Sequence, residues 1–180
     1  MKIISKKYLD QNFSDEEYVW YACYGSNINY DRFMYYIRGD ETEKYSTKAG
    51  CKDKNEPLEF KKYVFKCPIY FAGYSKRWGG GMAFLDYQNS GHSFGKIYKI
   101  KVSQFKGILE QEQRCKLYDA IVYVDNVESL AVFTFTAKEK LNDLNSPSHL
   151  YCQVIKEGLL QTYKELTITK INQYFKDSSI

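Results

Sequence analysis

Residues 18–27 constrain the fold more than any other part of this 180-residue sequence. An apolar and aromatic run, residues 18–24, ends abruptly at Gly25, Ser26 and Asn27. Apolar side chains then recur every three or four positions over residues 28–37, which is the spacing of a helix with one buried face. The pattern predicts a strand, a tight turn and the N-terminus of a helix.

A turn of this kind is suited to binding an anion. The first N–H groups of a helix have no partner within the helix, and the helix dipole adds positive potential at the same point. Gly25 would let a carboxylate, a phosphate or a developing oxyanion approach the backbone closely. The alternative is a plain structural turn in which Ser26 or Asn27 caps the helix.

The rest of the chain predicts one α+β domain, residues 18–180, after a polar leader, residues 1–17. Aromatic residues make up 17% of the sequence, so we expect an aromatic-rich core or pocket. Residues 39–57 predict a long loop, Ser103 a helix cap, and Asp125 with Asn126 a hairpin turn. Strands are expected at 63–71 (interrupted by Pro68), 82–85, 94–102, 117–124 and 130–136, and helices at 104–114, from 147 onward and near the C-terminus.

Composition and charge argue against several classes of function. The net charge is only +4 and the lysines are scattered, so nucleic-acid binding is not indicated. The sequence has no apolar signal-peptide region and no run long enough to span a membrane. The five cysteines form no metal or disulfide pattern, and neither histidine belongs to one. We therefore expect a cytoplasmic protein with reduced thiols, no metal and no cofactor.

Two carboxylates near residue 111 are candidates for acid–base chemistry. Glu110 and Glu112 are two positions apart on a predicted helix, so they do not share a face. One can be solvated while the other faces a cleft, where burial would raise its pKa and make it a usable general base. The alternative is an ordinary solvated helix end.

Five short segments follow one another along the chain, at residues 24–27, 75–84, 95–100, 111–118 and 147–158. In this order they resemble the motifs of the γ-glutamylcyclotransferase-like family, and the loop at 39–57 resembles that of a bacterial subgroup. Residues 24–27 resemble the family's Y-G-S-N turn, and residues 75–84 resemble its S-x-x-W-x-G-G-x-A-x block. Residues 95–100 resemble G-x-V-Y-x-I, and residues 111–118 resemble the Q-E-G…Y segment with the catalytic glutamate. Residues 147–158 resemble the closing P-S-x-x-Y…I-x-x-G helix. Two departures are Gln113 in place of the family's glycine and a longer loop at 39–57.

The resemblance implies a small mixed β-barrel of about six strands surrounded by short helices. It implies an enzyme that cyclises the γ-glutamyl group of a small amide to 5-oxoproline and releases an amine or amino acid. Glu112 would be the general acid and base. The substrate would contact a set of turn, wall and hydroxyl residues: Tyr24, Gly25, Ser26, Asn27, Trp78, Gly79, Gly80, Tyr118 and Tyr151.

Two alternatives remain open from the sequence. Gln113 is compatible with a ligand-binding or scaffold protein that keeps the pocket without turnover. RNA binding through Tyr and Lys ranks lower, because the aromatic residues occupy strand positions where a core explains them. The expected partner is a small γ-glutamyl compound, with no nucleic acid and no membrane, bound by a monomer or homodimer.

Overall fold

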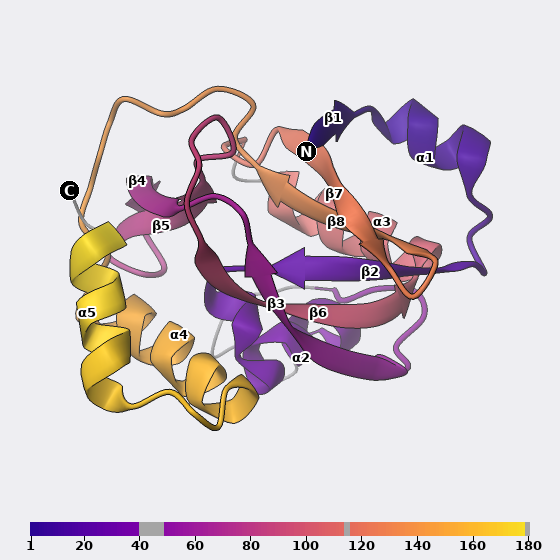
Figure 1. Cartoon of the computed structure of the whole chain (residues 1–180). Coiled ribbons are helices and arrows are strands. Elements are labelled where there is room, and N and C mark those ends of the chain that lie inside the picture. Colours follow the sequence, from indigo (N-terminus) through magenta and orange to yellow (C-terminus); the bar gives the residue numbers. More distant parts are fainter. Residues whose placement is uncertain (40–48, 114–115, 179–180) are drawn as a thin grey trace. The chain divides into compact units, whose positions relative to one another are not determined.

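The computed structural model describes residues 1–39, 49–113 and 116–178, drawn as a ribbon in Figure 1. The elements in chain order are β1 (Lys2–Ile4), α1 (Lys6–Asn12), β2 (Tyr18–Cys23), the 3-10 helix η1 (Ser26–Ile28), α2 (Tyr30–Arg38), β3 (Glu59–Phe65), β4 (Ile69–Ser75), β5 (Gly80–Leu85), β6 (Ser93–Lys101), α3 (Val102–Glu112), β7 (Ala120–Val127), β8 (Leu130–Thr136), α4 (His149–Thr162) and α5 (Ile168–Ser178). No described helix is both long and apolar enough to cross a bilayer.

The strands form a mixed six-stranded sheet and a separate two-stranded sheet. The larger sheet has the order β1-β7-β8-β2-β6-β3, and β4 pairs with β5. β2 runs parallel to β8, whereas β7 is antiparallel to both β1 and β8. The α+β prediction is confirmed. The predicted barrel is wrong: closure requires the first and last strands to pair, and β1 and β3 are the two edges of an open sheet in the part of the chain described.

Contacts divide the chain into two compact units, which we describe separately. Unit 1 comprises Met1–Ala22, Phe33–Lys61 and Ile97–Lys138, and unit 2 comprises Cys23–Arg32, Lys62–Lys96 and Glu139–Ile180.

Unit 1 has the aromatic core that the composition predicts. The rings of Phe33 and Tyr98 stack with centroids 3.9 Å apart, and Tyr21 lies 5.8 Å from Phe33. Such ring pairs add to the free energy gained by burying apolar area. Residues 1–17, expected as a leader, contribute β1, which pairs with β7, and α1, whose Leu9 is fully buried.

In unit 2, Tyr163 at the C-terminal end of α4 anchors that helix to the backbone of two strands. Its hydroxyl oxygen lies 2.7 Å from the carbonyl oxygens of both Tyr63 and Gly95. Burial raises the pKa of Tyr163 to about 12, so the hydroxyl remains a donor at neutral pH. The ring of Phe94 packs at 5.2 Å from Tyr163 and at 5.1 Å from Tyr174 of α5.

Two local predictions in unit 1 are wrong, and part of a third lies outside the described residues. Ser103 is inside α3, because the cap is Lys101, whose backbone N–H donates to the Gln104 side chain. Asp125 and Asn126 belong to β7, and the hairpin turns at Glu128 and Ser129, with φ of 50° and 65°. Residues 40–48 of the predicted loop are not described.

Candidate functional site

The 25–29 turn, which belongs to unit 2, connects β2 to α2 along the chain, as the sequence predicts. Gly25 is the N-cap of η1, whose bonds run from Ile28 N to Gly25 O and from Asn29 N to Ser26 O, both 3.1 Å. The N–H of Arg32, in the first turn of α2, donates to the Asn29 side chain, so Asn29 caps this helix rather than Ser26 or Asn27, the residues named in the alternative of a plain turn. Gly25 and Ser26 are partly exposed, whereas Asn27 is buried.

The conformation of Gly25 does not itself require glycine, since its φ is −110°. The requirement is space. A Cβ at this position would lie 2.8 Å from the Tyr151 hydroxyl oxygen and 3.7 Å from the Cβ of Ala83. The turn and α4 therefore touch at Gly25, and the Tyr151 hydroxyl also accepts the backbone N–H of Ala83 at 3.3 Å.

One face of α4 holds the turn along its length. Ser148 caps the helix by accepting the N–H of Tyr151, which sets where the helix begins. Gly158 lies seven residues after Tyr151, which is two helical turns further along α4. A Cβ at Gly158 would lie 2.6 Å from the Ile28 carbonyl carbon and 2.7 Å from the Asn29 Cα. Packing therefore explains the tyrosine and the glycine of the 147–158 segment, because both residues face the turn.

Polar contacts of α4 complete this junction. Asn29 Nδ2 donates to Glu157 Oε2 at 3.4 Å, and the backbone N–H of Tyr30 donates to Gln161 Oε1 at 3.1 Å. These bonds satisfy groups at the start of α2 that would otherwise lack a partner within the helix.

The glycines after Trp78 allow the start of β5 to lie close to the backbone that precedes α4. Gly79 has φ of +70°, which favours glycine. A Cβ at Gly80 would lie 2.7 Å from Ser148 N, and one at Gly81 would meet the Asn145 backbone, while Gly81 N donates to Ser146 O at 2.9 Å. In the structure, Gly80 therefore packs against the residues that start α4.

Trp78 and Tyr151 form an aromatic contact beside the turn. Their ring centroids are 5.0 Å apart, and both side chains are buried. The guanidinium carbon of Arg32 lies 5.7 Å from the Trp78 ring centroid, and Arg32 is only 4% exposed. Tyr24 is also buried, with its ring perpendicular to Phe65 at 5.7 Å.

Sequence reasoning missed Lys96, a fully buried lysine on β6. Its Nζ donates to the carbonyl oxygen of Ile28 at 3.2 Å and lies 5.9 Å from the Tyr30 ring centroid. Burial lowers the pKa of Lys96. The sequence does indicate an inward-facing lysine at this position. Side chains alternate between the two faces of a strand, and Lys96 shares its face with the apolar residues at 98 and 100.

Glu112 is the last residue of α3, in unit 1, and its neighbours have different surroundings. Glu110 is exposed and pairs with Lys6 at 3.3 Å. Gln111 is buried and donates to the carbonyl oxygens of Tyr36 and Gly107. Glu112 itself is half-buried. The expectation that one carboxylate is solvated holds for Glu110, and the role of Glu112 stays a prediction.

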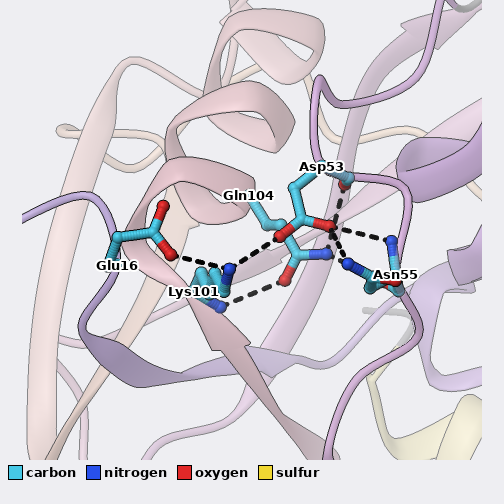
Figure 2. A network of polar contacts seen from close by, with 5 residues as sticks. All are labelled: Glu16, Asp53, Asn55, Lys101 and Gln104. Carbon is cyan, nitrogen blue, oxygen red and sulfur yellow. Dashed lines mark hydrogen bonds and ion pairs between the residues drawn. The ribbon is translucent and has the colours of Figure 1, made fainter.

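The start of α3 is fixed by a polar network, shown in Figure 2. Lys101 Nζ pairs with Glu16 at 2.7 Å and with Asp53 at 3.2 Å. Gln104 Nε2 donates to the carbonyl oxygens of Asp53 and Asn55 at 3.2 and 2.9 Å. The backbone N–H of Asn55 is the main reason that the pKa of the Asp53 carboxyl is lowered. The network ties the segment after residue 49 to the helix that carries Glu112.

The predicted site residues are thus distributed over both units. Residues 24–27, residues 78–80 and Tyr151 belong to unit 2, where Tyr151 lies against Gly25 and the Trp78 ring, and Gly80 packs against the start of α4. Glu112 and Tyr118 lie in unit 1, where Tyr118 is half-buried between α3 and β7. Among the described residues, no group of His, Cys, Asp or Glu side chains is arranged to hold a metal ion.

Solved structures define the class of fold. A γ-glutamyl cyclotransferase aligns with a TM-score of 0.64 at 15% identity, covering 88% of this chain and 86% of that one. An uncharacterised human protein aligns at 0.62 with 18% identity, covering 88% and 87%. YkqA from Bacillus subtilis aligns at 0.61 with 18% identity, covering 90% of this chain but 54% of that one. The chain has a γ-glutamyl cyclotransferase-like fold.

Sequence comparison adds little to this. No family model matches the chain. Histone deacetylase 5 of Arabidopsis thaliana is 33% identical over 99 residues, which is 52% of this chain but only 15% of that protein. The chain therefore spans a small fraction of the relative it matches.

Proposed function

We propose that the protein is a γ-glutamyl cyclotransferase-type enzyme that acts on a small γ-glutamyl amide. The observation that carries the proposal is the 25–29 turn at the end of β2, held by Tyr151 and Gly158 of α4 within this fold. Gly25 and Ser26 are partly exposed, which supports the proposal that their N–H groups bind an anionic group.

The proposed reaction is intramolecular. The substrate's α-nitrogen attacks its own γ-carbonyl carbon, and the new C–N bond closes a five-membered lactam. The tetrahedral intermediate then breaks its bond to the leaving nitrogen, which departs as a neutral amine, leaving 5-oxoproline. Intramolecular attack has a high effective molarity, so holding the substrate in a folded conformation supplies much of the rate.

One proton acceptor is required, because an α-ammonium cannot attack. In this proposal Glu112 takes that proton and returns it to the leaving nitrogen. N–H groups of Gly25, Ser26 and Asn27 stabilise the oxyanion and the α-carboxylate. This reaction requires neither metal nor cofactor.

The remaining predicted residues shape the substrate site in this proposal. Tyr24, Trp78, Gly79 and Gly80 form its wall, and Tyr118 and Tyr151 orient the substrate. The ring contact between Trp78 and Tyr151 supports a wall at this place. Gly80 packs on Ser148, so in this proposal Gly80 acts on the site indirectly, by fixing the start of α4.

The test is a screen of γ-glutamyl amides that differ only in the leaving group: amino acids, a dipeptide and a simple alkylamine. The full chain is incubated with each compound, and 5-oxoproline is detected by chromatography. We expect one class of leaving group to give 5-oxoproline well above the uncatalysed rate. Binding of these compounds without any 5-oxoproline would favour the alternative of a ligand-binding protein, and would contradict the proposed activity.

A further inference from the structure

Lys96 is placed where a neutral residue would be expected. It is one of the largest fully buried side chains of unit 2, and lysine is almost never fully buried without a partner or a function. Its backbone position is fixed, because a Cβ at the adjacent Gly95 would lie 2.8 Å from the Cys23 carbonyl oxygen, and the Cys23 thiol donates to the Lys96 carbonyl oxygen at 3.3 Å. From this point the side chain reaches Ile28.

The acceptor is part of the turn that the proposed function uses. Ile28 is the last residue of η1, and its N–H donates to Gly25 O, so Ile28 belongs to the same hydrogen-bonded turn as Gly25 and Ser26. Gly158 holds the Ile28–Asn29 backbone from α4, and Lys96 holds Ile28 from β6. The turn is therefore fixed by contacts from two elements.

At this position Lys96 brings to the turn a charge as well as a hydrogen-bond donor. A carbonyl oxygen is satisfied equally by a neutral donor, whereas burying an ammonium costs much more free energy. Burial lowers the pKa of Lys96, and Cys23 and Asp31 oppose that shift by favouring the charged form. In a buried environment a unit charge acts strongly on a nearby anion and is screened little by salt.

We propose that Lys96 is a positioning residue: its ammonium fixes the Ile28 peptide, and its charge makes the turn bind carboxylates in preference to neutral groups. The proposal rests on the proposed function for the identity of the carboxylate, which is that of 5-oxoproline. Lys96 acts through the turn and does not contact the reacting atoms.

The experiment compares two compounds that differ only in charge, 5-oxoproline and its neutral carboxamide, 5-oxoprolinamide. Binding of each is measured by calorimetric titration to wild type, Lys96→Met and Lys96→Gln, with a thermal melt of every sample. Methionine matches the length of lysine without its charge, and glutamine keeps an N–H donor. Lys170→Met, at an exposed lysine of α5, is the control that removes the same charge from the surface of the same unit.

We expect both Lys96 variants to lose about tenfold or more in the affinity ratio of 5-oxoproline to 5-oxoprolinamide, the size expected for loss of a unit charge at intermediate dielectric. Lys170→Met should keep the wild-type ratio. An unchanged ratio in a folded Lys96 variant, with or without weaker binding of both compounds, would overturn the proposal and leave Lys96 a structural residue. Wild-type protein that binds neither compound would instead contradict the proposed function, and the role of Lys96 would fall with it.

Discussion

Gly158→Ala tests the claim that α4 sets the geometry of the turn. Helix propensity alone predicts that alanine stabilises a helix interior by about 0.5–1 kcal/mol relative to glycine. The structure predicts the opposite, because the added Cβ would lie 2.6 Å from the Ile28 carbonyl carbon and 2.7 Å from the Asn29 Cα. Carbon atoms in contact are normally about 3.5–4.0 Å apart, so the overlap is about 1 Å.

The overlapping atoms belong to the backbone, so no side chain can rotate away. Overpacking of this kind costs about 1–3 kcal/mol, which exceeds the gain in propensity. For a chain of this size, we expect the free energy of unfolding to fall by about 1–2 kcal/mol and the melting temperature by roughly 2–8 °C. The turn should shift with Ile28 and Asn29, so affinity for 5-oxoproline should fall as well.

The matched control is Gly107→Ala, in the interior of α3. Its Cβ would meet the Cys51 Sγ at 2.9 Å, a side-chain atom rather than backbone. We expect this variant to stay within about 1 kcal/mol of wild type, because the contact and the propensity gain offset each other. Urea denaturation of both variants gives the comparison. Equal stability of Gly158→Ala and Gly107→Ala would refute the claim that the turn and α4 are in close contact.

Two further predictions concern the turn and the buried thiols. Gly25→Ala should lower the free energy of unfolding, because the new Cβ would lie only 2.8 Å from the Tyr151 hydroxyl oxygen. The same substitution should cost less stability in a Tyr151→Phe background, which lacks that oxygen. A double-mutant cycle by thermal melts should show a coupling of about 0.5–3 kcal/mol, and additive effects would contradict the contact. Burial raises the pKa of Cys23, Cys51 and Cys67 to about 12, so these thiols should resist iodoacetamide at pH 8 in the folded protein and react in urea, as followed by mass spectrometry. Rapid modification of all three in the native protein would show that they are not buried as described.

The sequence predicted the local order of elements well, because hydrophobic period and turn chemistry act over short distances. The strand, turn and helix around Gly25 could be predicted, as could the start of α4 at Ser148. The hairpin turn was misplaced by about three residues, because Asp125 and Asn126 are typical turn residues, whereas the structure turns at Glu128 and Ser129.

The long-range parts of the site could not be derived in this way. Nothing local indicates that Gly158 must be glycine, since the reason is the Asn29 backbone far away in sequence. The same holds for Gly81 and the Asn145 backbone. Open or closed pairing of the sheet is equally non-local: the family resemblance implied the barrel, and no local pattern of residues indicated the open sheet. Lys96 differs, because strand alternation did indicate an inward lysine and only its acceptor required the structure.

The most direct test of the proposed chemistry is turnover by Glu112→Gln beside Glu110→Gln. Glutamine keeps the size and hydrogen bonding of glutamate but cannot accept the proton. Glu110 is exposed and pairs with Lys6, so it is the matched control, two residues away on the same helix. We predict that Glu112→Gln loses about 10²–10⁴-fold in the rate of 5-oxoproline formation with an unchanged melt, and that Glu110→Gln turns over like wild type. Near-normal turnover by folded Glu112→Gln, or an equal loss in both variants, would contradict the assignment of Glu112 as the base.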